Sequence, residues 1–246
     1  MKIIAGMHRS GTSLAARLFY EAGAAMGRDD TFYRADRWNP EGYYEQPEIH
    51  AVNIPLVNGP YGRMSYLFLP STRTILRRSR KRDMADKIRT AIELYGDMVV
   101  KDPRFCLTLP AWQDHEARIH GVLVCLRDPI AVLGSLRKRN RTTPGHAFRL
   151  WLQHNQRVLE NTEDVPVWYL YYPNLLDDDA YDDEMASALR FFGLATTADE
   201  RRLLRQRCVR SQMDHNPAVP TRYPPAVGTL WSELRDRHRR QFEEEA

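Results

Sequence analysis

The sequence predicts an α/β protein with three layers, in which helices cover both faces of a central parallel sheet. Short apolar runs alternate along the chain with longer segments of helical periodicity, the pattern of such folds. The clearest run, residues 121–126 (GVLVCL), shows no apolar–polar alternation, as expected of a strand buried on both faces. The 246 residues fit one domain over 1–246, without internal repeats.

In the first half of the chain, a strand is predicted over Ile3–Ala5, followed by a helix that ends near Gly23. Pro47 suits the first turn of a short helix, which we expect to end near Pro55 because proline interrupts helix interiors. A further helix is predicted over residues 80–95, where apolar residues recur at helical spacing before Gly96.

The second half begins with a strand at residues 98–100 and a short helical piece interrupted at Pro110. After the strand 121–126, Asp128 is the expected N-cap of a helix that starts at Pro129. A fourth strand is predicted over 167–172. The remaining predictions are helices from Pro144, over 181–192 and over 199–207, then an irregular stretch at 208–228 and a charged C-terminal helix.

The composition is that of a mildly basic globular protein, with a net charge of +4. Such a charge suits an anionic ligand and also occurs in nucleic-acid-binding proteins. The densest basic run, Arg73–Arg82, has no interleaved aromatic residues, so we expect a solvated helix or a basic rim and no nucleic-acid partner.

The three cysteines, Cys106, Cys125 and Cys208, have neither the number nor the spacing of a disulfide framework or a metal site. No signal peptide precedes the first strand, and no apolar segment approaches the roughly 20 residues of a membrane helix. We therefore expect a cytoplasmic protein without a membrane span.

The segment Gly6–Ser13 (GMHRSGTS) lies between the first strand and its helix, where backbone N–H groups and the helix N-terminus can bind phosphate. Its two glycines and Ser13 have the spacing of GxxxxGK[ST]. Thr12 stands at the lysine position, and the cation of the loop is Arg9. The pattern predicts a phosphate loop that does not handle an ATP γ-phosphate in the usual way.

Two further strands also end at cations. Lys101 follows the second strand, and Arg127 follows the third, with Ser135 on the second turn of the next helix. A guanidinium and a hydroxyl so placed can share one phosphate, since arginine binds phosphate oxygens in a bidentate way. Structural alternatives are an ion pair of Lys101 with Asp102 and a capping or ion-pair role for Arg127.

Here the sequence resembles the sulfotransferases that use 3′-phosphoadenosine 5′-phosphosulfate (PAPS). The matching segments are GMHRSGTS and CLRDPIAVLGS, with weaker likeness in VVKDPR and in YPNLL at 172–176. The resemblance runs from Met1 to about Leu194. It implies the P-loop NTPase-like fold of that family and transfer of a sulfuryl group from PAPS to a hydroxyl or amine, without a metal. The acceptor expected is a small molecule, carbohydrate or lipid.

The resemblance also implies roles for individual residues. Arg127 and Ser135 would bind the 3′-phosphate, and Tyr172 would line the adenosine pocket, although a place in the core is an equal alternative for Tyr172. Lys101 and Arg9 are the cations suited to the leaving group. The 5′-phosphosulfate would lie against Arg9, Ser10, Gly11, Thr12 and Ser13.

The general base has several candidates. Many sulfotransferases carry a histidine two residues after the strand-end lysine, but Pro103 stands there. Relatives that act on protein tyrosine use a glutamate after the first helix instead, and Glu45 is our first choice. It precedes a helix start beside aromatic residues, whose desolvation would raise its pKa. His50 and then Asp102 are the alternatives.

Two other functions compete with this one. A P-loop nucleotide kinase or NTPase could use Asp102 as a magnesium-binding acid, but the lysine that reaches the β/γ-phosphates is replaced by Thr12. A catalytically silent nucleotide-binding protein would keep the fold alone. Acceptor contacts are expected from residues 29–66 and 137–143 and from the C-terminal tail.

Overall fold

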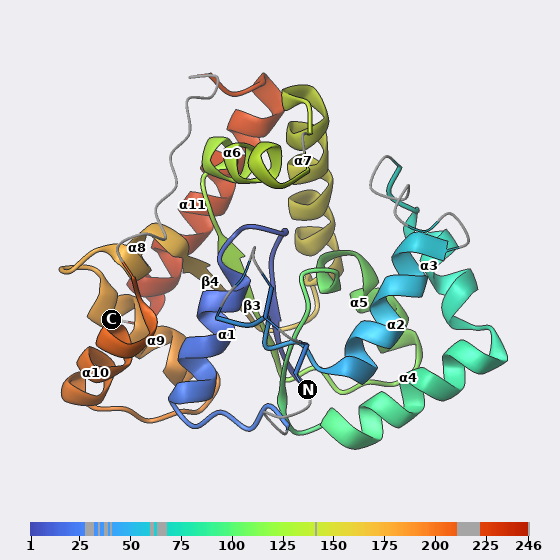
Figure 1. The fold of residues 1–246 in the computed structure, drawn as a ribbon, viewed down its shortest axis with the longest axis horizontal. Coiled ribbons are helices and arrows are strands. Elements are labelled where there is room, and N and C mark those ends of the chain that lie inside the picture. Colours follow the sequence, from blue (N-terminus) through green and yellow to red (C-terminus); the bar gives the residue numbers. More distant parts are fainter. Residues whose placement is uncertain are drawn as a thin grey trace.

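The computed structural model describes residues 1–27, 32–33, 35–36, 39, 41–59, 62, 68–140, 142–210 and 222–245. At its centre lies a four-stranded sheet in the order β2-β1-β3-β4, in which every pair of neighbours is parallel (Figure 1). The strands are β1 (Lys2–Ala5), β2 (Val99–Lys101), β3 (Gly121–Leu126) and β4 (Val167–Tyr171). The predicted fold class is thus confirmed.

Helices cover both faces of this sheet. Figure 1 shows α2 to α5 on one side of the strands and α8 to α10 on the other. The helices are α1 (Thr12–Glu21), α2 (Pro47–Asn58), α3 (Thr72–Ser79), α4 (Arg82–Tyr95), α5 (Phe105–Asp114), α6 (Pro129–Asn140), α7 (Pro144–Asn161), α8 (Tyr172–Leu176), α9 (Tyr181–Phe191), α10 (Ala198–Cys208) and α11 (Pro225–Glu245). Among the described residues, none of these helices combines the length and apolar character needed to cross a bilayer.

The strands alternate their side chains between two separate cores, as the two-residue period of a strand requires. In β3, Val122 and Val124 enter the core formed with α2, α4, α5, α6, α7 and α11. Leu123 and Cys125 enter the core formed with α1, α9 and α10. All six residues of β3 are buried, which explains why the run lacks polar residues.

Two prolines do not end their helices as predicted. The helix from Pro47 continues through Pro55 to Asn58, and α5 runs through Pro110 to Asp114. An interior proline costs a helix roughly 3 kcal/mol. Beyond Pro55, Leu56 and Val57 are buried in the core, and each fully buried side chain of this size returns about 1.5–3 kcal/mol. Core packing therefore outweighs the local helix-breaking signal.

Most of the basic run lies in a helix of its own, α3, which ends just before α4 begins. Ser71 caps α3 by accepting a hydrogen bond from the Thr74 N–H at 3.3 Å. The predicted helix over 80–95 starts later, at Arg82, because Arg80 ends α3 and binds Asp114 with two hydrogen bonds of 2.9 and 2.7 Å. Arg78 donates to the carbonyl of Leu56 at 2.7 Å, so part of this run has a structural role.

The boundaries after β4 and before the C-terminal helix also differ from the prediction. Tyr172 is not the last residue of β4 but the first of α8, a short helix with Pro173 in its first turn. The C-terminal helix begins within the stretch expected to be irregular, at Pro225, while residues 211–221 lie outside the described part of the chain. Trp231 of α11 packs edge-on against Trp151 of α7, which ties this helix to the core.

Candidate active site

Residues from all four strands meet at the carboxyl edge of the sheet. The chain leaves β1 toward β2 and later returns to place β3 on the opposite side of β1, so the connections diverge at this edge. Such a switch point is where open α/β sheets bind their ligands. Here lie the loop 6–11, Lys101, Arg127 and Tyr172, each at the end of a different strand.

The loop after β1 has a backbone that two glycines make possible. Gly6 has φ +140°, and a Cβ there would lie 2.8 Å from the carbonyl oxygen of Cys125 in β3. Gly11, the N-cap of α1, has φ +92°, and a Cβ there would lie 2.1 Å from the Tyr172 ring. Only glycine avoids both the strain and the clash. Thr12 then starts α1, with its N-terminus at the loop.

Arg9 joins the loop to the residues that follow β3. Its Nε donates to Ser135 Oγ at 2.7 Å, and its carbonyl oxygen accepts a hydrogen bond of 3.1 Å from Arg127. Burial lowers the pKa of the Arg9 guanidinium, and the nearby charges of Arg139 and Arg127 lower it further. Cations gathered in this way repel one another, so the arrangement favours a bound anion.

Arg127 and Tyr172 form one wall of an open cavity. The Arg127 guanidinium lies 4.4 Å from the centre of the Tyr172 ring, and both residues are largely buried. The cavity measures about 490 Å³, within the range of small-ligand pockets. Its lining includes Arg127, Asp128, Tyr172, Pro173, Leu176 and Asp177.

Asp128 has the N-cap role that the sequence predicts. Its Oδ1 accepts hydrogen bonds from the backbone N–H groups of Ile130, at 2.7 Å, and Ala131, at 3.3 Å. Its Oδ2 accepts from the Tyr223 hydroxyl. The guanidinium of Arg127 contacts the Arg9 carbonyl and the Tyr172 ring, and Arg127 lines the cavity.

Lys101 is a second buried cation of the site, with 1% of its surface exposed. Its ammonium donates to Glu45 Oε1 at 2.7 Å, to the Tyr43 carbonyl at 3.1 Å and to Ser13 Oγ at 3.2 Å. The alternative ion pair with Asp102 is not formed, because Asp102 instead accepts from the backbone and the guanidinium of Arg104. A lysine from β2 therefore reaches the loop that has Thr12 at the usual lysine position.

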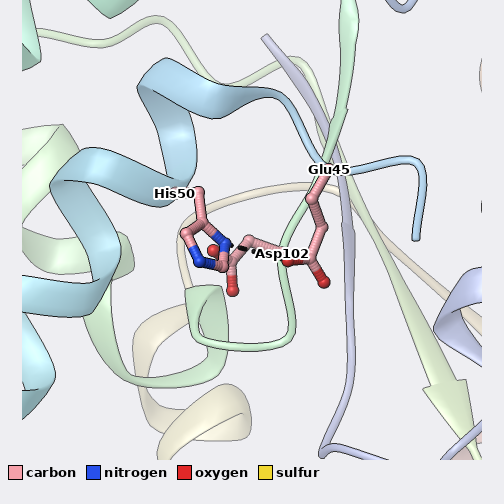
Figure 2. Close-up of side chains that lie close together, drawn as sticks. All are labelled: Glu45, His50 and Asp102. Atoms are coloured by element: carbon pink, nitrogen blue, oxygen red, sulfur yellow. Dashed lines mark hydrogen bonds and ion pairs between the residues drawn. The ribbon is translucent and has the colours of Figure 1, made fainter. Parts of the chain in front are cut away.

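The three candidates for the base lie together, as Figure 2 shows for Glu45, His50 and Asp102. His50 Nδ1 lies 3.0 Å from Glu45 Oε2. One polar atom from each of the three residues lies within 4.8 Å of the others, a grouping that could also ligate a metal and that the sequence did not predict. However, the two carboxylates already form ion pairs, Glu45 with Lys101 and Asp102 with Arg104.

Comparison with known proteins rests on structure, since no family model and no curated protein matches the sequence. The sulfotransferase domain of the Synechococcus PCC 7002 olefin synthase matches with a TM-score of 0.52 and 15% identity, over 96% of this chain and 94% of that one. The sulfotransferase domain from the curacin biosynthetic pathway matches with a TM-score of 0.51 and 13% identity, over 96% and 97%. The chain has a sulfotransferase fold.

Within this sulfotransferase fold, the environment of Glu45 differs from our expectation. Burial by itself would raise the pKa of the carboxyl group, as predicted. The charge of Lys101 and the hydrogen bonds from His50 and Lys101 outweigh burial, so the pKa lies well below its usual range. The prediction of a raised pKa was wrong because it took account of the aromatic neighbours alone.

The lowered pKa of Glu45 predicts how stability depends on pH. Because the folded-state pKa lies below the unfolded one, the pair stabilises the protein above the ordinary glutamate value of about 4.3 and loses this effect as the pH falls through the folded-state pKa. Urea unfolding should give the wild type a larger free energy of unfolding than the Glu45→Gln variant. The difference between the two should be constant near neutral pH and shrink in acid. A difference that grows in acid would contradict the ion pair.

Two residues at this edge of the sulfotransferase fold were missed in the sequence. Arg104 binds Asp102, and a signal for it was present in the segment KDPR. The side chain of Gln46 binds the backbone of β2, and no local pattern points to it. The acceptor segment 29–66 is only partly described, and Trp38, Tyr61 and Tyr66 lie outside the described residues.

Proposed function

We propose that the protein is a PAPS-dependent sulfotransferase that acts on a hydroxyl or amine of a small-molecule, carbohydrate or lipid acceptor. The observation that carries this proposal is the position of Lys101. Its buried ammonium contacts both Ser13 of the phosphate loop and Glu45, the candidate base. One cation therefore lies between the place for a 5′-phosphosulfate and the group that would activate the acceptor.

The donor site would have two parts. The 5′-phosphosulfate would bind the loop of Arg9, Ser10, Gly11, Thr12 and Ser13, at the N-terminus of α1. The 3′-phosphate would bind Arg127 and Ser135, which Arg9 links in space, and the adenosine would enter the cavity beside Tyr172. The gathered guanidinium groups and the glycine-shaped loop fit an anion of this kind.

PAPS supplies a sulfuryl group bound to a phosphate, which is a good leaving group. Glu45 would take the proton of the acceptor while the acceptor oxygen or nitrogen bonds to sulfur. The bond between sulfur and the bridging phosphate oxygen would break, and Lys101 with Arg9 would neutralise the charge left on that oxygen. Donor binding would draw Lys101 toward the phosphosulfate and so weaken its hold on Glu45, which makes the carboxylate a stronger base.

The competing functions receive less support. A kinase would use Asp102 to hold magnesium, but this carboxylate is 0% exposed and binds Arg104 twice through the guanidinium, at 3.0 and 3.2 Å. A silent nucleotide-binding protein would have no need for a buried lysine and glutamate pair, since burying two charges is costly. Two of the structural neighbours come from an olefin synthase and a biosynthetic pathway, which favours small-molecule acceptors.

The direct test of this proposal is transfer of ³⁵S from labelled PAPS to a mixed panel of small molecules, sugars and lipids. The expected result is a labelled product together with stoichiometric 3′-phosphoadenosine 5′-phosphate. Binding of the nucleotide without transfer to any member of a broad panel would favour the silent protein. A double variant, Glu45→Gln with Lys101→Met, serves as the inactive control.

Substitution of Arg127 should separate nucleotides by their 3′-phosphate. In the Arg127→Ala protein, affinity for 3′-phosphoadenosine 5′-phosphate should fall by about 1.5–3 kcal/mol, the usual strength of a charge-assisted hydrogen bond. Affinity for adenosine 5′-phosphate should hardly change. Isothermal titration calorimetry measures both, with the exposed Arg89→Ala as a matched control. Equal losses for the two nucleotides would mean that Arg127 only supports the Tyr172 wall.

A further inference from the structure

Gln46 has an unusual position next to the candidate base. It is 0% exposed, and both ends of its side-chain amide bind backbone groups. Nε2 donates to the carbonyls of Met26 at 2.9 Å and Val99 at 3.1 Å, while Oε1 accepts from the Lys101 N–H at 3.2 Å. The amide therefore has a partner for both of its N–H groups.

These bonds follow the pattern of a parallel strand. In a parallel ladder, one residue donates to the carbonyl before its partner and accepts from the N–H after it. The Gln46 amide does this around Val100, whose own partner on the other side is Ile3 of β1. Since β2 is an edge strand, the glutamine side chain takes the place of a missing neighbour.

Gln46 also connects the polar residues of the site. It follows Glu45 directly in the chain, and its backbone carbonyl accepts the first hydrogen bond of α2, from the N–H of His50 at 3.0 Å. Its side chain binds the backbone N–H of Lys101. Gln46 therefore links three elements. It is joined by a peptide bond to Glu45 in the loop, and by hydrogen bonds to His50 in α2 and Lys101 in β2.

We propose that Gln46 is the positioning residue that fixes Glu45 against Lys101 at the end of β2. The expected effect of Gln46 on turnover rests on the proposed function, whereas its effect on the position of Glu45 does not. A loop attached to β2 through its own backbone could slide along the strand. The amide fixes its register, and so sets the 2.7 Å contact between the carboxylate and the ammonium.

The chain offers a matched control at the opposite edge of the sheet. Gln241 of α11 binds the edge strand β4 in a similar way, donating to the Tyr169 carbonyl at 2.7 Å and accepting from its N–H at 2.8 Å. Its partner strand β4 is the one farthest from β2 in the sheet order. Loss of this amide removes the same kind of edge contact without touching Glu45 or Lys101.

The test is a ¹³C NMR titration of the Glu45 carboxyl group, assigned by its loss in Glu45→Gln, in the wild type, Gln46→Met and Gln241→Met. Methionine keeps the length and volume of glutamine and removes both kinds of hydrogen bond. In Gln46→Met the pKa of Glu45 should rise toward the ordinary glutamate value, and in Gln241→Met it should stay as in the wild type. Gln46→Asn, which keeps an amide too short to bridge β2, is the second variant if Gln46→Met does not fold.

Turnover gives the second measurement. In Gln46→Met, kcat should fall by about 10- to 100-fold with KM for PAPS unchanged, because a displacement near 1 Å can cost this much. Gln241→Met should retain the wild-type kcat. An unchanged titration of Glu45 in both Gln46 variants, or an equal shift in Gln241→Met, would overturn the proposal. If the wild type transfers no sulfuryl group, the proposed function fails, while the titration still decides the role of Gln46.

Discussion

Replacement of Lys101 by methionine is expected to lower kcat for sulfuryl transfer by about 10²–10³-fold, the usual effect of removing one group that stabilises transition-state charge. The lysine is buried, so water cannot substitute for it, and it is the cation in contact with both Ser13 and Glu45. Methionine preserves the length of the side chain while removing the charge. Single-turnover measurements with saturating PAPS separate this loss from any loss of donor binding.

The control for Lys101→Met is Lys87→Met, an exposed lysine of α4. Thermal melts must accompany the kinetics, because removing one partner of a buried ion pair destabilises a protein by roughly 3–5 kcal/mol. A folded Lys101→Met protein with wild-type single-turnover rates would exclude Lys101 from the chemistry. Its ion pair with Glu45 would then have a structural role only.

The second large effect is expected for Glu45→Gln. Glutamine keeps the shape of the side chain and removes the basic oxygen, so kcat should fall by about 10²–10⁴-fold, the usual contribution of general acid–base catalysis. Affinity for 3′-phosphoadenosine 5′-phosphate should stay close to that of the wild type, because the contact with Ser13 of the loop is made by Lys101, to which Glu45 is bound. The measurements are steady-state turnover and calorimetry on the same preparations.

Glu48→Gln provides the matched control for this variant. Glu48 lies on α2, three residues after Glu45, and accepts a hydrogen bond from the Tyr95 hydroxyl of α4 at 2.6 Å. We expect its turnover to match the wild type. A Glu45→Gln protein with undiminished turnover would instead assign the base to His50, whose ring lies 3.0 Å from the Glu45 carboxylate.

The parts of the site that could be predicted from the sequence are those that depend on short local patterns of residues. Gly6 and Gly11 mark a loop that needs glycine, and Asp128 before Pro129 marks a helix start; the structure confirms both features. The buried strand 121–126 was equally clear, because burial on both faces excludes polar residues from a short run. Each of these signals depends only on residues near in sequence.

The remainder depends on contacts between distant residues. Lys101 and Glu45 are 56 positions apart, so neither their ion pair nor the lowered pKa of Glu45 follows from a local pattern. The same holds for Gln46, whose partner Lys101 is 55 positions away. The helix from Pro47 was predicted to end near Pro55 and continues to Asn58, because burial of the residues after Pro55, rather than their helix propensity, decides the conformation.

The most direct test of a PAPS site in this protein is calorimetric binding of 3′-phosphoadenosine 5′-phosphate, compared with ATP in the presence and absence of magnesium. We expect tight binding of the 3′-phosphorylated nucleotide without any metal requirement, because Arg9, Arg127 and Ser135 are linked beside the cavity. ATP should bind more weakly, since Thr12 replaces the lysine that reaches the γ-phosphate. Tighter binding of ATP with a magnesium requirement would contradict the sulfotransferase proposal.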